Sequence, residues 1–193
     1  TNDKEFDNIY QRIEKYEGIS DRVEVEIATY LNKVSTYELS DESSRKLQAL
    51  FRIISEIESV ADSNFSLART LKRKREQKVW FNQEMRDNLN KMFDMLDEAY
   101  NIMKENLEIS QRSVSINLGP VYEVESKINE FRIFLKEDHI RSIEANEYKY
   151  QAGVIYSDLF NEAEKMGDYI INVSEAIAEI EKPVKHKSYP IGK

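Results

Sequence analysis

The sequence predicts an all-α protein, and three observations point to this class. Apolar residues recur every three or four positions over long stretches, as they do along one face of an α-helix. The 193 residues include five Gly and three Pro, so few positions favour turns. Charged residues make up 33 % of the chain, and this composition favours a few long helices over a strand-rich fold. A chain of this length buries one good core or two small ones.

Composition and charge exclude several classes of function. The chain has no Cys, so it forms no disulfide, no thiolate zinc site and no iron–sulfur cluster. Its formal net charge of -8 at pH 7 argues against a nucleic-acid binder and favours cations as ligands. No stretch has the apolar length of a transmembrane helix, and no signal peptide is visible. The start at Thr1 in place of Met is compatible with a piece excised or processed from a longer protein.

Two helices are predicted in the first 78 residues. The first covers about residues 3–36, and its apolar stripe consists of Phe6, Ile9, Ile13, Tyr16, Ile19, Val23, Ile27, Tyr30, Leu31 and Val34. The second runs from Ser40, an N-cap, to the basic run near Arg75, whose charge complements the helix dipole. Its predicted core positions are Leu47, Leu50, Phe51, Ile54, Ile57, Ala61, Phe65 and Ala68. A further apolar flank indicates that this helix lies between neighbours, and it consists of Ile53, Val60, Leu67 and Leu71.

Three further helices are predicted after residue 78. The third covers about residues 80–109, with Met92, Met95 and Met103 as core fillers, and ends at a break over residues 110–119. The fourth covers about residues 120–143 and begins with Pro120, which suits the first helical position. The fifth covers about residues 150–181, has another broad apolar arc, and is stopped by Pro183. Residues 183–193 are predicted to form an irregular tail.

Acidic residues lie beside these apolar arcs in a regular spacing. Glu58 with Asp62, and Glu164 with Asp168, have the spacing Glu-x-x-x-Asp. Residues four apart lie on the same helix face, so each pair presents two carboxylates to one neighbouring point. The first helix carries further acidic residues at the edge of its stripe, and these are Glu17, Asp21 and Glu24. Carboxylates beside a core cost desolvation energy unless a cation, a donor or water satisfies them.

The acidic positions repeat along the chain. Glu17 and Asp21 match Glu125 and Asn129, 108 residues later, and Glu58 and Asp62 match Glu164 and Asp168, 106 residues later. We therefore expect two copies of one helical unit, in residues 1–78 and 79–182. Antiparallel packing of the acidic helices in each copy brings four carboxyl or amide groups together. Such a cluster suits hard cations or iron.

The repeated motif resembles that of a known family. Glu58-Ser59-Val60-Ala61-Asp62 and Glu164-Lys165-Met166-Gly167-Asp168 resemble the repeated Glu-x-x-x-Asp signature of PhoU proteins. Residues 15–31 are similar to the PhoU-like cytoplasmic domain that follows the membrane part of bacterial sodium/phosphate cotransporters. The second half, from Asp138-His139 through to Glu179, also fits. The resemblance spans nearly the whole chain and depends on several motifs occurring in order.

The resemblance implies a tandem of three-helix bundles related by internal duplication, with the first bundle lacking its first helix. It also implies a non-catalytic regulatory or accessory domain in phosphate uptake, cytoplasmic and tethered to the inner membrane through a transporter domain absent from this chain. The implied partners are the membrane domain of a phosphate transporter or a sensor protein. Loss of one helix leaves an apolar groove against the first two helices, which a second chain can fill to form a homodimer.

The resemblance further implies metal binding, with iron, zinc, manganese or calcium as the candidate ions. The implied ligands of the first cluster are Glu17, Asp21, Glu24, Glu58 and Asp62, and those of a weaker second cluster are Glu125, Glu164 and Asp168. In the second copy Asn129 and Arg132 stand where the first has acidic residues, and a cation beside a cation site is unfavourable. We expect Arg132 to pair with Glu125 or Glu164 in place of a metal. Family copies usually continue the motif with His, whereas Ser63 and Tyr169 stand there in this chain.

A purely structural interpretation also fits the sequence. The same acidic edges, solvated and paired with Lys and Arg, belong to a helical protein–protein interaction module without metal. An enzyme is not predicted, because His139 and His186 do not complete the Glu-x-x-His motif of di-iron oxidases. We expect His139 to pack at a helix surface or against a loop. Without an activated nucleophile or a glycine-rich phosphate loop, no catalytic residue, organic cofactor site or direct phosphate site is predicted.

Overall fold

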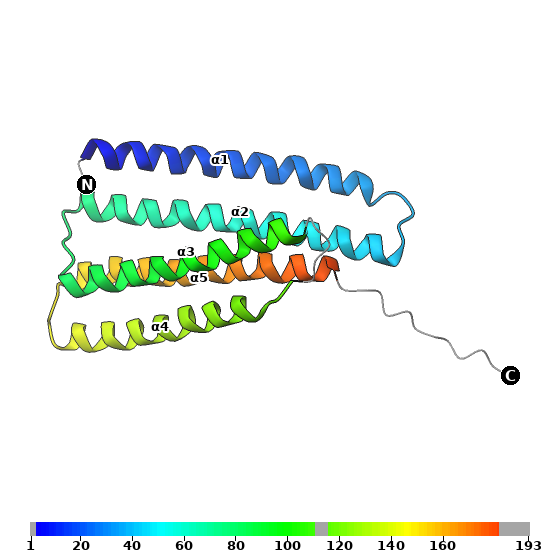
Figure 1. Ribbon diagram of the computed structural model, residues 1–193. Coiled ribbons are helices and arrows are strands. Elements are labelled where there is room, and N and C mark those ends of the chain that lie inside the picture. The colour runs from blue at the N-terminus through cyan, green and yellow to red at the C-terminus, as the bar shows by residue number, and fades with distance from the viewer. Residues whose placement is uncertain (1–2, 111–115, 182–193) are drawn as a thin grey trace.

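The computed structural model describes residues 3–110 and 116–181 of the chain. These residues form five α-helices and no strand: α1 (Asp3–Val34), α2 (Asp41–Glu76), α3 (Gln83–Ser110), α4 (Gly119–Glu144) and α5 (Tyr150–Glu181) (Figure 1). The predicted all-α class is therefore confirmed for the described residues. A membrane span is not among these helices, because none of them holds a sufficiently long apolar stretch.

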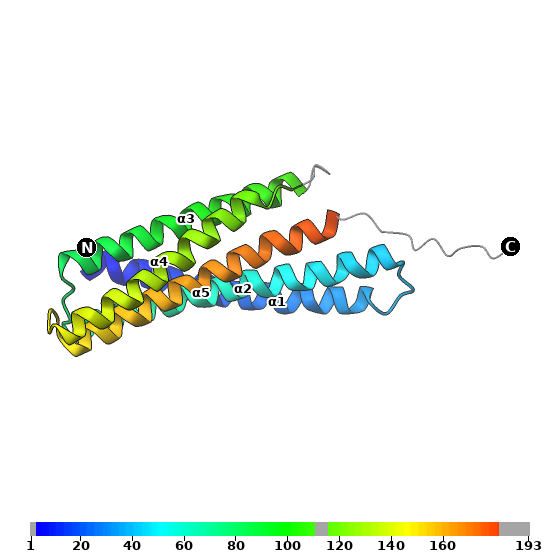
Figure 2. The ribbon, with the colours of Figure 1, turned by 90° about the horizontal axis from the view of Figure 1, so that it is seen from below.

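Four helices lie side by side in the order α1, α2, α5, α4, and each runs antiparallel to its neighbour (Figure 1). α3 packs on α5 and α4 from one side of this layer (Figure 2). α2 lies between α1 and α5, as its broad apolar arc predicts. α1 lies at the edge of the layer, where it packs on α2 and on no other described helix.

The helix ends follow local sequence signals. The hydroxyl oxygen of Ser40 accepts a hydrogen bond from the backbone N–H of Ser43 at 3.1 Å, which caps α2 as predicted. α4 has Pro120 in its first turn, and α5 has the bounds expected from the sequence. α3 begins at Gln83 and not at residue 80, because Asn82 Oδ1 accepts a hydrogen bond from the N–H of Met85 at 2.8 Å. Residues 111–115 of the predicted break and the whole predicted tail lie outside the described residues.

The core lies between α3, α4, α5 and the inner face of α2. Its largest fully buried side chains come from α3, α4 and α5, and they include Tyr156, Phe160, Met85, Met92, Ile128 and Leu135. Met92 and Met103 are buried as predicted, and Met95 is partly buried against the same core. Full burial of one such side chain stabilises a protein by about 1.5–3 kcal/mol.

The apolar faces of α1 and α2 are less buried than the sequence predicts. In α1, Leu31 is buried, whereas most of the other stripe residues are exposed or half-buried. In α2, the predicted flank residues Ile53 and Leu67 are buried, whereas Leu50 and Ile57 of the predicted core are exposed. The reason is that α1 has one helical neighbour, so an apolar side of the α1–α2 hairpin stays open.

Candidate functional site

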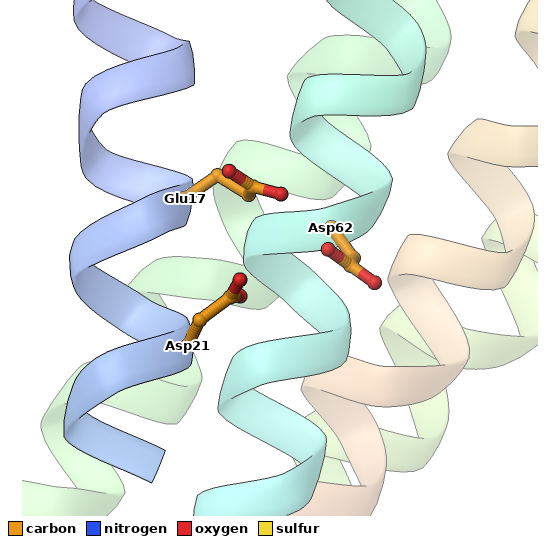
Figure 3. Close-up of side chains that lie close together, drawn as sticks. All are labelled: Glu17, Asp21 and Asp62. Atoms are coloured by element: carbon orange, nitrogen blue, oxygen red, sulfur yellow. The ribbon is translucent and has the colours of Figure 1, made fainter. Parts of the chain in front are cut away.

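The first predicted acidic cluster forms where α1 and α2 pack against each other. Glu17 and Asp21 lie one turn apart on α1 and face Asp62 on α2 (Figure 3). One carboxylate oxygen from each of these residues lies within 4.8 Å of the others. Within the part of the chain that the structure describes, this is the one group of three acidic or His side chains compact enough to hold a metal ion.

Glu58 lies one turn before Asp62 and adds charge to the cluster. Burial raises the pKa of Glu58, and together with the negative charges of Asp62, Glu24 and Asp21 and a hydrogen bond with Asp62 it brings this pKa to about 7. Glu24 and Glu58 therefore interact with the cluster, but they do not belong to its compact three-ligand group. The structure brings together three of the five predicted ligands and leaves the other two beside them.

Glu17 is half-buried, and the neighbouring carboxylates also affect its pKa. Burial raises the pKa of Glu17, and Asp21 and Asp62 raise it further, while the Arg69 guanidinium opposes them. Carboxylates this close repel one another, and either a proton or a bound cation relieves the repulsion. The carboxylates of the cluster therefore favour a bound cation, whereas Arg69 and Lys165, which line the cavity beside them, oppose it.

A polar cavity of about 460 Å³ opens beside Glu17 and Asp62. Three serines of α2 contribute to its wall, and these are Ser59, Ser63 and Ser66. The available donors are carboxylate and hydroxyl oxygens, which suit calcium or manganese, whereas zinc and iron commonly take His or Cys ligands. Of the four candidate ions, the residues present fit calcium and manganese best.

The second predicted cluster lies between α4 and α5 and contains its own cation. Arg132 donates to Glu164 Oε1 from Nη2 at 2.8 Å and from Nε at 3.1 Å, as expected for a residue that takes the place of a metal. These residues line a cavity of about 490 Å³ together with Glu125, Asn129 and Asp168. Burial raises the pKa of Asp168, Glu164 and Glu125 add to the rise, and Arg132 opposes it.

The first cluster lies on α1 and α2, and the second lies on α4 and α5. Each position of the first cluster has its counterpart in the second at the sequence offset of 108 or 106. The clusters differ in charge, because Asn129 and Arg132 replace two carboxylates. Comparison with known proteins adds no relative, since no family model, no curated protein and no solved structure matches the chain.

His139 packs against Tyr148 of the loop between α4 and α5, as expected, and it is not part of either cluster. Its Nδ1 lies 2.7 Å from the Tyr148 hydroxyl, and the two rings stack with their centroids 6.0 Å apart. The rings of Tyr156 and Phe160 also contact it. Burial lowers the pKa of His139 below its ordinary value. His186 lies outside the described residues.

The basic end of α2 holds α1 in place through contacts that the sequence does not predict. Arg75 Nη2 donates to Asp7 Oδ1 at 2.5 Å, and the Arg75 guanidinium lies 4.3 Å from the centre of the Phe6 ring. Lys72 Nζ lies 4.4 Å from the centre of the Tyr10 ring. The spacing of charges and aromatic rings in the sequence gives no sign of these pairs, because the partners are more than 60 residues apart.

Ion pairs also join α2 to α5 near both ends of their contact. Arg52 pairs with Glu175 at 3.0 Å and with Glu179 at 3.3 Å, and it donates to Asn172 Oδ1 at 3.2 Å. Toward the other end, Arg73 pairs with Asp158. The two contacts have the same polarity, with the cation on α2 and the carboxylate on α5 in both cases, and they resist separation of the central helices.

Proposed function

We propose that this chain is a non-catalytic regulatory or accessory domain in phosphate uptake, of the PhoU type, whose first acidic cluster binds a divalent cation. The convergence of Glu17, Asp21 and Asp62 carries the metal part of this proposal. Residues about forty positions apart meet at one point, and all three are among the five ligands that the resemblance implies. The connection with phosphate uptake rests on the resemblance of the repeated motifs to PhoU proteins.

The proposed partner is the membrane domain of a sodium/phosphate cotransporter, or a sensor protein of the same system. In this arrangement the helical domain responds to a divalent cation and alters the activity of the transporter, while phosphate itself passes through the membrane domain. The proposed role of the chain is therefore to regulate the transporter by direct contact. In this proposal the chain is cytoplasmic and is tethered to the inner membrane through its partner.

Metal binding is tested by calorimetric titration of chelator-treated protein with calcium and with manganese. The wild-type chain is expected to bind one ion at the first cluster. Glu17→Gln combined with Asp62→Asn removes two ligands and abolishes this binding. Glu26→Gln combined with Asp94→Asn changes the net charge by the same amount at exposed positions outside the cluster and leaves binding intact. Equal binding by the two double variants would refute the site.

The role in phosphate uptake requires an experiment in cells. Removing the segment that encodes this chain from its native gene is expected to change the uptake of labelled phosphate. The Glu17→Gln, Asp62→Asn variant is expected to keep uptake but to lose its response to added calcium or manganese. Phosphate uptake that is the same with and without the segment would contradict the proposed function, whatever the result for metal binding.

The alternative is a structural interaction module whose acidic edges are solvated. The exposure of Asp21 and Asp62 favours it, because exposed acidic groups are common without a bound ion. In this case neither ion binds, and Glu17→Gln with Asp62→Asn raises the free energy of unfolding through reduced repulsion. A metal-dependent increase in thermal stability of the wild type distinguishes the first proposal from this one.

A further inference from the structure

An apolar row on α1 has the spacing of a helix-packing surface. Its positions follow one another in alternating steps of four and three residues, and Ser20 is the one polar residue among them. The apolar residues, called here the α1 seam, are Ile9, Ile13, Tyr16, Val23, Ile27 and Tyr30. This seven-residue repeat is typical of a helix that packs along another helix. All of these except Ile13 are exposed to solvent. Among the described helices, none packs along the exposed part of the α1 seam.

A second row of the same kind lies on α2. It has the same spacing, and Asn64 is its one polar position. Its apolar residues, called here the α2 seam, are Leu50, Ile54, Ile57, Ala61, Ala68 and Leu71. The two seams meet at a cavity of about 370 Å³, whose wall includes Ile9 of α1, Leu71 of α2 and Tyr100 of α3. This cavity and the exposed remainder of the two antiparallel seams are called here the groove, and α3 borders the groove at the cavity.

The matching residues of α4 are buried where those of α1 are exposed. The offset of 108 that relates the acidic clusters pairs Tyr16 with Val124 and Val23 with Phe131. Tyr16 is 59 % exposed and Val124 1 %, while Val23 is 45 % exposed and Phe131 7 %. The offset was fixed by acidic residues, so it is independent of this contrast in burial.

The α2 seam shows the same contrast at the offset of 106. Leu50 is 40 % exposed and its counterpart Tyr156 is 2 % exposed, while Ile57 is 38 % exposed and Ala163 is fully buried. The cover on α4 and α5 is α3, whose own buried seven-residue repeat is Met85, Leu89, Met92, Leu96, Ala99 and Met103. In the second half of the chain, one helix therefore covers both seams.

We propose that the groove between the α1 and α2 seams binds one amphipathic helix of a partner polypeptide, in the place on α1–α2 that α3 takes on α4–α5. The partner helix carries a seven-residue apolar repeat like that of α3. A second copy of this chain would bring a two-helix hairpin, and α3 already borders one end of the groove, so a single helix fits better. The groove lies outside the acidic cluster, and the interaction does not depend on a bound metal.

The test uses the full chain and a synthetic peptide of residues 83–110, the sequence of α3, with a fluorescent label. Its methionine-rich repeat adapts to surfaces of differing shape, which makes it a suitable probe. Fluorescence anisotropy is expected to show binding to the wild type. Val23→Lys and Ile57→Lys place charge in the groove and are expected to weaken binding at least about tenfold. Val25→Lys changes an exposed apolar residue of α1 outside the seam and leaves binding unchanged.

Three outcomes would overturn the proposal. The first is that the peptide binds the wild type no more tightly than a peptide of the same composition with a scrambled apolar repeat. The second is binding that Val23→Lys and Ile57→Lys leave intact, which would place the peptide elsewhere, for example in exchange with α3. The third is a dimer in sedimentation equilibrium that Val23→Lys converts to a monomer, because a second copy would then occupy the groove. Circular dichroism shows that each variant is folded.

Discussion

Arg132 holds Glu164 with two hydrogen bonds to the same carboxylate oxygen, and it thereby supplies the positive charge that the second acidic cluster needs. The first cluster has Glu24 at the matching position and accumulates negative charge instead. The two clusters therefore differ in charge at this position. Exchanging the residues that differ should make the charge of the second cluster resemble that of the first.

Asn129→Asp combined with Arg132→Glu is expected to create a second cation site. The changes give α4 the carboxylates that α1 carries, so calorimetry should detect one additional calcium or manganese ion per chain. Without added metal the double variant should lose about 1 kcal/mol of stability or more, because an ion pair is lost and repulsion is added. Asn90→Asp with Arg12→Glu makes the same charge change at exposed positions and should create no site.

His139→Phe is expected to make stability less dependent on pH on the acidic side. Because burial lowers the pKa of His139 below 6.5, the unfolded chain binds this proton more readily than the folded chain. The wild type therefore loses stability as pH falls from 6.5 toward the folded pKa, and it keeps this contribution above 6.5. Urea unfolding at a series of pH values, with His186→Phe as the control, measures the difference. Parallel curves for the wild type and His139→Phe would contradict the assignment.

Gly153→Ala and Gly18→Ala are expected to change stability in opposite directions. A Cβ at Gly153 would lie 2.9 Å from His139 Cε1 and 3.0 Å from Tyr148 Cε2, so the packed rings must move, at a cost of about 1–3 kcal/mol. At Gly18 the nearest atom is Arg22 Nη1 at 3.9 Å, and the helix gains about 0.5–1 kcal/mol. Thermal unfolding of the two variants measures both effects. A stabilised Gly153→Ala variant would show that the ring packing yields easily.

Arg52→Ala is expected to cost more stability than Arg73→Ala. Arg52 bonds to Asn172, Glu175 and Glu179 from a half-buried position, whereas Arg73 has one ion pair with Asp158 at an exposed position. We expect losses of about 1–2 kcal/mol for Arg52 and below about 1 kcal/mol for Arg73. Urea unfolding of both variants at low and high salt tests this order. Equal losses would mean that the extra bonds of Arg52 add nothing.

The sequence predicts most of the local structure because local signals determine it. Ser40 caps α2, Pro120 opens α4, and α5 has the predicted bounds, since each depends on neighbouring residues. The buried side of α1 and α2 is predicted less well. Apolar spacing shows which residues can be buried, but not how many neighbours a helix has, so Leu50 and Ile57 were expected in the core and are exposed.

The candidate site is predicted in part for a related reason. Glu17, Asp21 and Asp62 can be predicted to meet, because they follow from the spacing on each helix and from antiparallel packing of the two helices. Glu58 and Glu24 lie on the same helices but outside the group. Each is about one helical turn from a residue of the group, and the sequence does not determine the register of the two helices to within one turn. The bonds of Arg52 could not be predicted, because their partners lie more than 100 residues away.

The ion pairs at the two ends of the α2–α5 contact have a mechanical consequence. Arg52 near the start of α2 and Arg73 near its end fix the two central helices at two separate points along their length. Sliding by one helical turn, about 5.4 Å, would break both attachments at once. Tilting of α2 on α5 would stretch at least one of the two, because they lie far apart along the helices. The two sets of ion pairs therefore fix both the register and the angle of the central helix pair.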